Sequence, residues 1–490
     1  MSASSAPPAA RRWWALALIA TAQFMVIMDT SIIGVALPRI QDDLGFSQEN
    51  LSWVFNAYVV AFGGLLLLGG RLSDLFGARR LFSAGWVVLL TGSAVAGAAG
   101  TITAGTVAVE LTGRALQGVG AALIAPAALT LLMMLFGSEP RELTKALSLY
   151  GAAAPAGGTA GVFLGGVITE YVSWPWVFYI NIPIAVLALA AAPVLMPGGR
   201  GGARGSIDVI GALTVTAGLG VIVFAVVRAP EVGWDAAATW AVLAAGLVLL
   251  GLFLAVQASR RAPLMPLSIF RAPNLGAANL AQLLLGAAWI PMWFFLNLYL
   301  QQVLGYSAFP SGAALVPMTA LIMLGMIVLA PRAIGRLGGK TTIVTGLLVL
   351  AAGMGWLSLI RPDGNYWVDV LPASLVAALG MSLAFIPSLG TALSAARPEE
   401  GGLASGIVNT SYQVGSALGL AAMTAIAASS GARRLGDLPA LTDGFSAAFI
   451  GAGLIALAGA ALAAVTLRTP RRDPAPAPSL QAEHEKVPGH

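Results

Sequence analysis

Long apolar stretches follow one another along the whole chain, and short polar segments separate them. Each stretch is close to or longer than the ~20 residues with which an α-helix crosses a bilayer. The alternating polar and apolar strands that build outer-membrane barrels are absent from the pattern. The pattern therefore predicts an all-α integral membrane protein. We expect its spans at 13–36, 51–70, 81–100, 105–135, 143–169, 176–196, 207–228, 236–258, 273–303, 309–330, 341–360, 368–395, 401–429 and 445–467.

Composition agrees with this prediction and excludes several kinds of chemistry. The 490 residues are 58% hydrophobic and only 10% charged, whereas soluble domains carry about 25% charged residues. There is no cysteine, and both histidines, His484 and His490, lie near the C-terminus. Disulfides, thiol catalysis, cysteine metal sites and histidine catalysis in the membrane body are thereby excluded. We expect no metal and no cofactor, and a disordered tail at 468–490, which is polar and proline-rich.

The placement of basic residues predicts the orientation in the membrane. An even number of spans puts both termini on one side, and cytoplasmic loops carry the excess of Lys and Arg. With both termini cytoplasmic, nearly all basic residues fall on the inside. The exceptions are Arg114, within a span, and the outside residues Arg39, Arg228, Arg361, Arg433 and Arg434. The net charge of +5 thus reflects membrane topology, and we expect no nucleic-acid partner.

An internal repeat is visible in two loops. Residues 70–80, after the second span, and 331–340, after the tenth, align Arg71 with Arg332, Gly77 with Gly338 and Arg79 with Lys340. A duplicated six-helix unit with two inserted helices accounts for this repeat, and such repeats bracket a substrate site near the midplane. The expected organisation is a cytoplasmic N-terminus at 1–12, a six-helix bundle at 13–199, two inserted helices with their loops at 200–272, a second six-helix bundle at 273–467 and the tail at 468–490.

Five motifs in chain order resemble those of the major facilitator superfamily. Residues 70–80 are similar to its motif A, 114–122 to motif B and 157–166 to motif C, the antiporter signature. Residues 29–38 and 174–183 resemble the helix 1 and helix 6 motifs of the fourteen-span drug:proton antiporters. The resemblance implies the major facilitator fold, no enzymatic activity and a multi-pass location in the bacterial inner (cytoplasmic) membrane.

Three positions depart from the motifs of that family. Val162 stands where motif C usually has proline, and Pro175 stands where the helix 6 motif usually has arginine. Gly335 replaces the acid in the second copy of motif A. Only the first copy is therefore expected to act as a charged contact.

Asp29 lies about two-thirds of the way along the first apolar stretch. A carboxylate at such a depth costs about 2.5–3.5 kcal/mol on insertion scales, and intramembrane acids generally face a cavity or a partner. We expect Asp29 to be a protonatable site that faces the central cavity, a role that the resemblance supports. A purely structural, hydrogen-bonded Asp29 is the alternative.

Glu110 and Arg114 are four residues apart and share one face of the fourth span. An ion pair between them would lower the cost of a buried arginine. The pair is either static or switchable, with protonation of Glu110 or Asp29 freeing Arg114 to change partner. The resemblance ties the arginine of motif B to proton coupling, so Asp29, Arg114 and Glu110 form the expected proton-coupling set.

Two glycine-containing motifs are expected to act in the conformational change. The resemblance implies that Asp74 holds the two halves together on the cytoplasmic side in the outward-facing state; the other residues of this latch are Gly70, Arg71, Gly77, Arg79 and Arg80. The run of Gly157, Gly161, Gly165 and Gly166 permits close approach of a neighbouring helix. Static packing explains that run equally well.

Aromatic and polar side chains supply candidates for a substrate cavity. An apolar wall with few polar groups suits bulky amphipathic compounds, although aromatic residues at helical spacing are also typical of a core or of an interfacial belt. The candidates are Gln23, Asn56, Tyr58, Gln117, Trp289, Trp293, Phe294, Asn297 and Tyr299.

Together these features predict a proton-coupled antiporter that exports amphipathic drugs or antibiotics by alternating access. The partners are then a small amphipathic molecule, protons and the lipid bilayer, and we expect a monomer. No phosphate-binding loop of the Gly-x-x-x-x-Gly-Lys-Ser/Thr type is present, so ATP is not expected to drive transport. The alternatives are a specific exporter of one endogenous metabolite or antibiotic and, from another class, a non-transporting membrane receptor.

Overall fold

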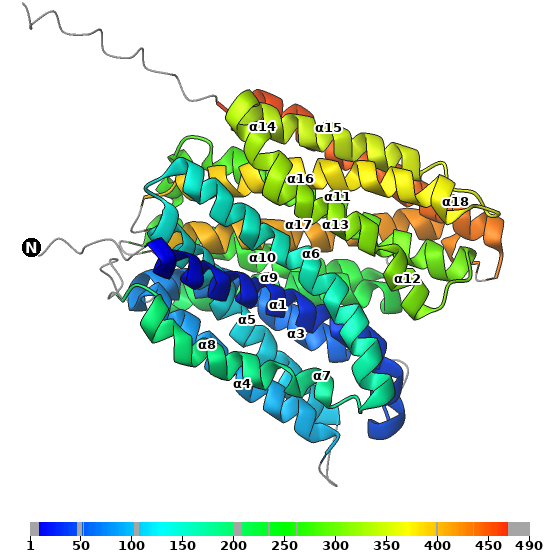
Figure 1. Ribbon diagram of the computed structural model, residues 1–490, viewed down its shortest axis with the longest axis horizontal. Helices are drawn as coiled ribbons and strands as arrows, with labels where there is room; N and C mark the ends of the chain where they lie inside the picture. Colours follow the sequence, from blue (N-terminus) through cyan, green and yellow to red (C-terminus); the bar gives the residue numbers. More distant parts are fainter. Residues whose placement is uncertain are drawn as a thin grey trace, which may run out of the picture.

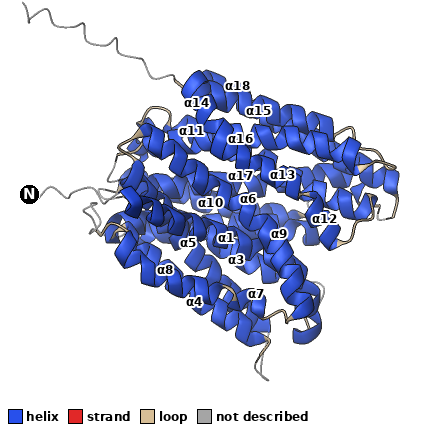
Figure 2. Cartoon of the chain, viewed as in Figure 1, coloured by secondary structure: helices blue, strands red, loops and turns tan. Residues whose placement is uncertain are grey.

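The computed structural model describes residues 9–46, 51, 53–101, 107–198, 208–233, 236–260, 263–397, 400–434 and 436–468. Across these residues the regular structure is helical, without strands (Figure 2). The α-helices are α1 (Ala9–Leu44), α3 (Trp53–Phe76), α4 (Ala78–Ala99), α5 (Val107–Phe136), α6 (Pro140–Tyr171), α7 (Trp176–Tyr179), α8 (Asn181–Leu195), α9 (Val209–Val232), α10 (Ala237–Ser259), α11 (Leu275–Leu298), α12 (Ala308–Ala314), α13 (Val316–Leu324), α14 (Ala330–Leu337), α15 (Gly339–Leu357), α16 (Leu371–Ser394), α17 (Gly401–Ala427) and α18 (Leu438–Thr466).

The all-α fold class predicted from the apolar stretches is confirmed. Thirteen helices of the described chain are long and apolar enough to cross a membrane, and short π-helical turns complete several of them, such as η2 (Tyr299–Val303) and η3 (Gly325–Leu329). The expected seventh span coincides with α9, whose apolar part Val209–Ala225 falls short of that length. The predicted tail, apart from Arg468, lies outside the described residues, as do residues 1–8 of the N-terminal segment.

Helix α1 extends well beyond the predicted end at residue 36. It continues through Pro38 to Leu44, although proline generally disfavours the interior of a helix. The Nε1 of Trp174 donates a hydrogen bond to the Asp43 carboxylate at 2.6 Å, which anchors this extra length to the segment between α6 and α7.

Two similar groups of helices form the molecule (Figure 1). We call α1 to α8 the N-half and α11 to α18 the C-half. Within the N-half α1 packs on α6 and α4 packs on α5; within the C-half α11 packs on α17 and α15 packs on α16. In Figure 1 the N-half, coloured blue to blue-green, lies below the C-half, coloured green to red. Helix α9 packs on α3 of one half and α17 of the other, and α10 packs on α9.

The two loops of the sequence repeat have the same backbone conformation. Gly77 links α3 to α4 with φ 94°, and Gly338 links α14 to α15 with φ 80°. Positive φ is accessible to glycine without steric cost. In Figure 1 the start of α1, the end of α18 and the turn after α14 lie at the same end of the molecule. The backbone thus agrees with the alignment of these two loops.

Candidate functional site

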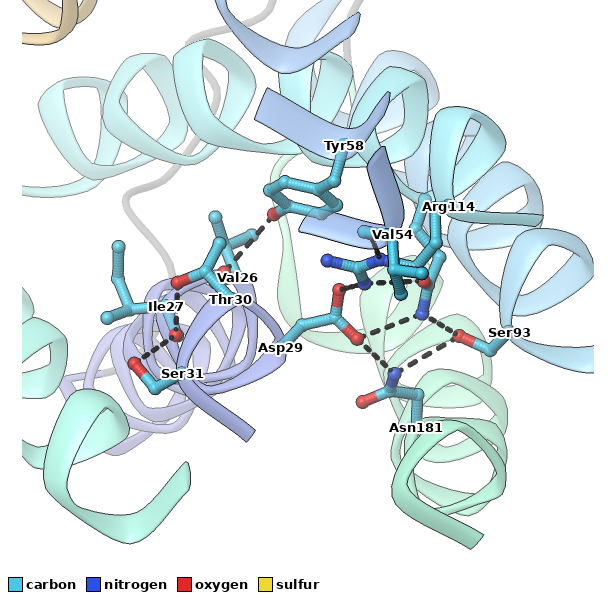
Figure 3. Close-up of polar contacts among 11 residues, drawn as sticks. Val26, Ile27, Asp29, Thr30, Ser31, Val54, Tyr58, Ser93, Arg114 and Asn181 are labelled. Atoms are coloured by element: carbon cyan, nitrogen blue, oxygen red, sulfur yellow. Dashed lines mark hydrogen bonds and ion pairs between the residues drawn. The ribbon is translucent and has the colours of Figure 1, made fainter. Parts of the chain in front are cut away.

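Asp29 accepts three hydrogen bonds in the interior of the N-half (Figure 3). Its Oδ2 accepts from Arg114 Nη1 at 2.7 Å, and its Oδ1 accepts from Gln117 Nε2 at 2.9 Å and from Asn181 Nδ2 at 2.7 Å. Only 1% of the residue is exposed. Because a buried carboxylate is tolerated only when it is paired and hydrogen-bonded, this donor set fits an ionised Asp29.

Arg114 is fully buried and is held on several sides. Its Nε donates to the Val54 carbonyl at 2.8 Å and its Nη1 also donates to Gln117 Oε1 at 2.8 Å. The guanidinium carbon lies 4.8 Å from the centre of the Tyr58 ring and 5.9 Å from that of Phe178, within the range of cation–π attraction. The cation is thus compensated by one carboxylate, two oxygen acceptors and two aromatic faces.

Ser93 and Asn181 complete the network and come from two further helices. The Ser93 hydroxyl accepts from Gln117 Nε2 at 2.9 Å and from Asn181 Nδ2 at 3.1 Å. Tyr58 donates its hydroxyl to the Val26 carbonyl of α1 at 3.1 Å. We call Asp29, Tyr58, Ser93, Arg114, Gln117 and Asn181 the Asp29 network. It joins α1, α3, α4, α5 and α8, so a change in the charge of Asp29 acts on five helices at once.

The position of this network corrects the expectation that Asp29 faces the central cavity. Its carboxylate points to α4, α5 and α8 of its own half, where fixed side-chain donors take the place of water. Tyr58 and Gln117, expected in a substrate cavity, are likewise fully buried in the network. A hydrophobic pattern shows that a helix is buried but does not distinguish the bundle interior from the interface between bundles.

Glu110 does not form the expected ion pair with Arg114. It is fully buried, and within the described part of the chain neither of its carboxyl oxygens has a hydrogen-bond partner. Arg114 pairs with Asp29 instead, because two amide donors already orient that carboxylate. The i, i+4 spacing leaves Glu110 one turn away from Arg114 on α5.

The glycine run of α6 packs directly on the turns of α1 around Asp29. A Cβ atom at Gly157 would collide with the Phe24 carbonyl, one at Gly161 would lie 2.8 Å from the Met28 carbonyl, and one at Gly165 would lie 2.8 Å from the Ile32 carbonyl. A Cβ at Gly166 would meet no atom within 4 Å, so this glycine takes no part in the contact. Close approach of the backbones requires the other three glycines.

Asp74 joins the two halves at the ends of α3 and α17. Its Oδ1 accepts from the backbone N–H of Gly402 at 2.7 Å and its Oδ2 from that of Leu403 at 2.8 Å. These donors belong to the first turn of α17, where free N–H groups and the helix dipole favour an anion. Gly70 permits the approach, because a Cβ there would collide with the Gly402 carbonyl.

The basic residues of the same motif lie around this contact, and the charge of Arg71 acts on the Asp74 carboxylate. Arg79 Nη1 donates to the Pro193 carbonyl of α8 at 3.4 Å, while Arg71 is half-buried and Arg80 is exposed. The charged contact between the halves is therefore made by Asp74.

The remaining cavity candidates are not gathered into one site. Gln23 Oε1 accepts from the Tyr150 hydroxyl at 2.8 Å, between α1 and α6. Tyr299 donates to the Arg361 carbonyl at 2.7 Å, and Asn297 Oδ1 accepts from Gln301 at 3.3 Å. The other candidates differ in exposure: Asn56 and Trp289 are buried, Trp293 is half-buried and Phe294 is exposed.

The C-half contains an uncharged cross-link that the sequence did not reveal. Gln282 of α11 donates from Nε2 to the Ser388 hydroxyl at 3.0 Å and to the Phe385 carbonyl at 3.2 Å, both on α16. Nothing in an isolated glutamine or serine marks such a bond. Ser93 of the Asp29 network was missed for the same reason, whereas Asn181 lay within the 174–183 motif.

Comparisons with known proteins agree with this architecture. Residues 19–420 match the model of the Major Facilitator Superfamily. The chain is 40% identical to the cephamycin export protein CmcT of Amycolatopsis lactamdurans, over 94% of this chain and 93% of that protein. It is 38% identical to the puromycin resistance protein pur8 of Streptomyces alboniger, over 89% and 86%. It is 32% identical to the lincomycin resistance protein of Streptomyces lincolnensis, over 97% and 95%.

Solved structures show the same fold at low sequence identity. The proton:xylose symporter XylE superposes with a TM-score of 0.66 at 14% identity, covering 93% of this chain and 95% of that one. The transporter FucP in the outward conformation superposes with a TM-score of 0.64 at 13% identity, covering 94% and 100%.

Proposed function

The chain belongs to the Major Facilitator Superfamily, and it is a membrane transporter and not an enzyme. From this premise we propose that it exports an antibiotic or a similar amphipathic compound in exchange for protons. Relatives over most of the chain are named for antibiotic export or resistance. They support the direction of transport and the class of substrate. The proton coupling rests on the geometry of the Asp29 network.

One observation supports the proposed proton coupling: Asp29 lies on α1 between the hydrogen-bond network of the N-half and the helix contact with α6. Protonation of its carboxylate removes the charge that holds Arg114 and weakens the bonds from Gln117 and Asn181. The same turns of α1 lie against the glycine run of α6, and α6 packs on α13 and α16 of the C-half. Loading a proton therefore perturbs a helix that touches the opposite half.

Alternating access requires contacts between the halves that break and re-form. The bonds from Gly402 and Leu403 to Asp74 are such a contact at one end of the bundle. We place this end in the cytoplasm of a bacterial cell, with both termini and fourteen spans including α9, because the basic loops lie there. The structure then corresponds to a state closed towards the cytoplasm.

The coupling is tested in proteoliposomes with Asp29→Asn. Efflux or exchange of puromycin, lincomycin or a cephamycin is measured with a proton gradient, and proton release is measured upon addition of the compound. The wild type is expected to do both. Asp29→Asn should lose gradient-driven transport, whereas Asp42→Asn, an exposed acid on the same helix, should keep it. Gradient-driven transport by Asp29→Asn at the wild-type rate would refute the assignment.

Export of one endogenous compound is the second candidate, and the names of the relatives favour it because each specifies a single antibiotic. Chemically unrelated antibiotics are tested against cells that produce the wild type or Asp29→Asn. Protection against one scaffold supports a specific exporter. Protection against several supports a polyspecific one.

A further inference from the structure

Three described residues in or beside the Asp29 network have polar side-chain atoms without partners. Within the described chain these are both carboxyl oxygens of Glu110, Arg114 Nη2 and Asn181 Oδ1, and all are buried. Buried polar atoms in native proteins nearly always have a partner, so each exception requires an explanation. Their occurrence at one place, beside a satisfied ion pair, indicates a second arrangement of the same groups.

The net charge of the buried groups Asp29, Glu110 and Arg114 determines how many protons the two carboxyls hold. Arg114 carries one positive charge, and Glu110 and Asp29 carry up to two negative charges. With both acids ionised the buried cluster is left with a net negative charge, and with both protonated it is left with a net positive one, each costly in the interior. A single proton makes the cluster neutral. Since Asp29 accepts three hydrogen bonds and Glu110 accepts none, the proton belongs on Glu110 in this state.

We propose that Glu110 is the residue that holds the transported proton in this state, passes it to Asp29, and then takes over Arg114 as its own ionic partner. This inference rests on the proposed proton-coupled function and names the route of the proton. The O–H bond at Glu110 breaks and an O–H bond forms at Asp29, while Arg114 keeps its proton throughout. The cluster therefore remains neutral on both sides of the exchange.

The geometry provides the parts that this exchange needs. Residues four apart on a helix lie side by side, and the unpartnered Nη2 of Arg114 is the donor available to an ionised Glu110. The Val54 carbonyl and the Tyr58 ring hold the guanidinium as a pivot while Nη1 leaves Asp29.

In the part of the chain that the structure describes, the surroundings of Glu110 add no further charge to this balance. The charged groups that act on Glu110 are Arg114 on its own helix and Asp29 on α1. Among the described residues, the other titratable group of the network is Tyr58 of α3, whose ring faces Arg114, while α4 and α8 contribute the neutral Ser93 and Asn181. Of the described carboxyls, Glu110 and Asp29 are therefore the two that share the proton.

Infrared spectroscopy of the purified full-length protein tests the proton on Glu110 independently of transport. A protonated carboxyl has a C=O stretching band well separated from that of a carboxylate. We expect such a band at neutral pH in the wild type, shifted by labelling with ¹³C-glutamate and lost in Glu110→Gln. Glu170→Gln, an exposed acid on α6, should leave the band unchanged. The labelling arm needs no substitution and remains informative if Glu110→Gln does not fold.

The exchange of Arg114 makes a second and sharper prediction for the same spectrum. Asp29→Asn removes the carboxylate that competes for Arg114, so Glu110 should ionise and its band should disappear although Glu110 itself is unchanged. A band that persists in Asp29→Asn, or a wild-type band that does not shift with labelled glutamate, overturns the proposal.

Transport assays separate this proposal from the proposed function. Glu110→Gln should lose gradient-driven transport of the substrate but keep substrate–substrate exchange, which moves no net proton. If the wild type shows no proton coupling while the spectra behave as expected, the proposed function fails and the proton on Glu110 stands. If the wild type is coupled and Glu110→Gln is equally coupled, the role of Glu110 in coupling is refuted.

Discussion

The two halves of the molecule share a packing scheme. In the N-half the glycines of α6 lie against backbone carbonyls of α1; in the C-half a Cβ at Gly415 or Gly419 of α17 would collide with the carbonyl of Leu283 or Ala287 of α11. The pair of α1 and α6 and the pair of α11 and α17 thus both approach closely through small residues.

The halves differ in the chemistry of the bonds between their buried helices. Asp29 and Arg114 link α1 to α5 as an ion pair, whereas Gln282 and Ser388 link α11 to α16 as neutral groups. A buried ion pair contributes little net stability compared with an apolar replacement, so stability does not explain its presence. A neutral amide–hydroxyl bond does not respond to protons. In the described part of a duplicated scaffold, the link between α1 and α5 can thus respond to protons, whereas the corresponding link between α11 and α16 cannot.

The largest expected effect is the loss of one member of the ion pair. Arg114→Met leaves the Asp29 charge buried with two neutral amide donors, and breaking such a pair costs about 3–5 kcal/mol. Gln282→Leu breaks the corresponding neutral bond and should cost only about 0.5–1.5 kcal/mol. Unfolding in mixed micelles by increasing SDS, monitored by circular dichroism, gives both values.

The double variant Asp29→Asn with Arg114→Met is the control for this prediction. Removal of both charges should recover most of the stability that Arg114→Met loses, without recovering proton coupling. Equal losses of stability in Arg114→Met and Gln282→Leu would contradict the contrast between the halves.

The second largest expected effect concerns the contact that Asp74 makes with α17. The other copy of the repeat cannot make this contact through an acid, because Gly335 stands at the corresponding position. Asp74→Asn removes a charge from the bonds to Gly402 and Leu403, and bonds to charged groups contribute about 1.5–3 kcal/mol. We expect the ends of α3 and α17 to separate in a larger fraction of molecules. Because the native chain has no cysteine, spin labels at Arg80→Cys and Arg397→Cys report the distance by pulsed electron resonance.

A second acid serves as the control for the Asp74 measurement. Asp363 is exposed in the segment that follows α15 and makes no contact between the halves in the described chain. Asp363→Asn should leave the distance distribution of the labelled protein unchanged. An unchanged distribution in Asp74→Asn as well would show that other contacts hold this end closed.

A smaller effect tests the symmetry of the packing itself. Gly161→Ala and Gly419→Ala each add a methyl group where a backbone carbonyl lies too close, and such overpacking costs about 1–3 kcal/mol. Gly166→Ala has free space and should change stability by less than about 0.5 kcal/mol. Thermal unfolding in detergent compares the three. A loss of stability in Gly161→Ala but not in Gly419→Ala would show that the two halves do not share this packing between helices.

The sequence predicts those features that depend on length, spacing and glycine. Apolar stretches predicted the helices because a bilayer requires a minimum length. The alignment of Gly77 with Gly338 agrees with the structure, where both have positive φ, which glycine adopts readily. The charge of Asp29 in an apolar span indicated that its carboxylate has polar partners within the protein, and it accepts three hydrogen bonds.

The partners themselves depend on rotations and translations of helices that no local pattern encodes. The choice of Arg114 between Glu110 and Asp29 is decided by amide donors on α5 and α8, 88 and 152 residues away from Asp29. The i, i+4 spacing favoured Glu110 because it describes one isolated helix. The orientation of Asp29 into its own bundle likewise follows from the packing of α4 and α8 around α1.

The smallest expected effect lies in the inserted helices, which belong to neither half. Asp208 caps α9 by accepting from the Gly211 N–H at 2.9 Å, and it accepts from Gln257 of α10 at 2.9 Å. Gln257 in turn accepts from the Met265 N–H at 2.9 Å, which ties the pair to the segment before α11. Burial alone would raise the pKa of Asp208, but the bonds from Gly211 and Gln257 outweigh it and hold the pKa below its ordinary value.

A lowered pKa in the folded protein means that ionised Asp208 stabilises it above the pKa of the unfolded chain, about 3.9. That contribution is lost as pH falls through the lower pKa of the folded state. Asp208→Asn should therefore cost about 1 kcal/mol at pH 7, with the difference from wild type shrinking below about pH 4. Thermal unfolding across pH measures this difference. Proton-coupled transport should stay intact, since the proposed proton-coupling residues lie in the N-half. A variant that unfolds normally but has lost coupling would show that α9 and α10 also take part in coupling.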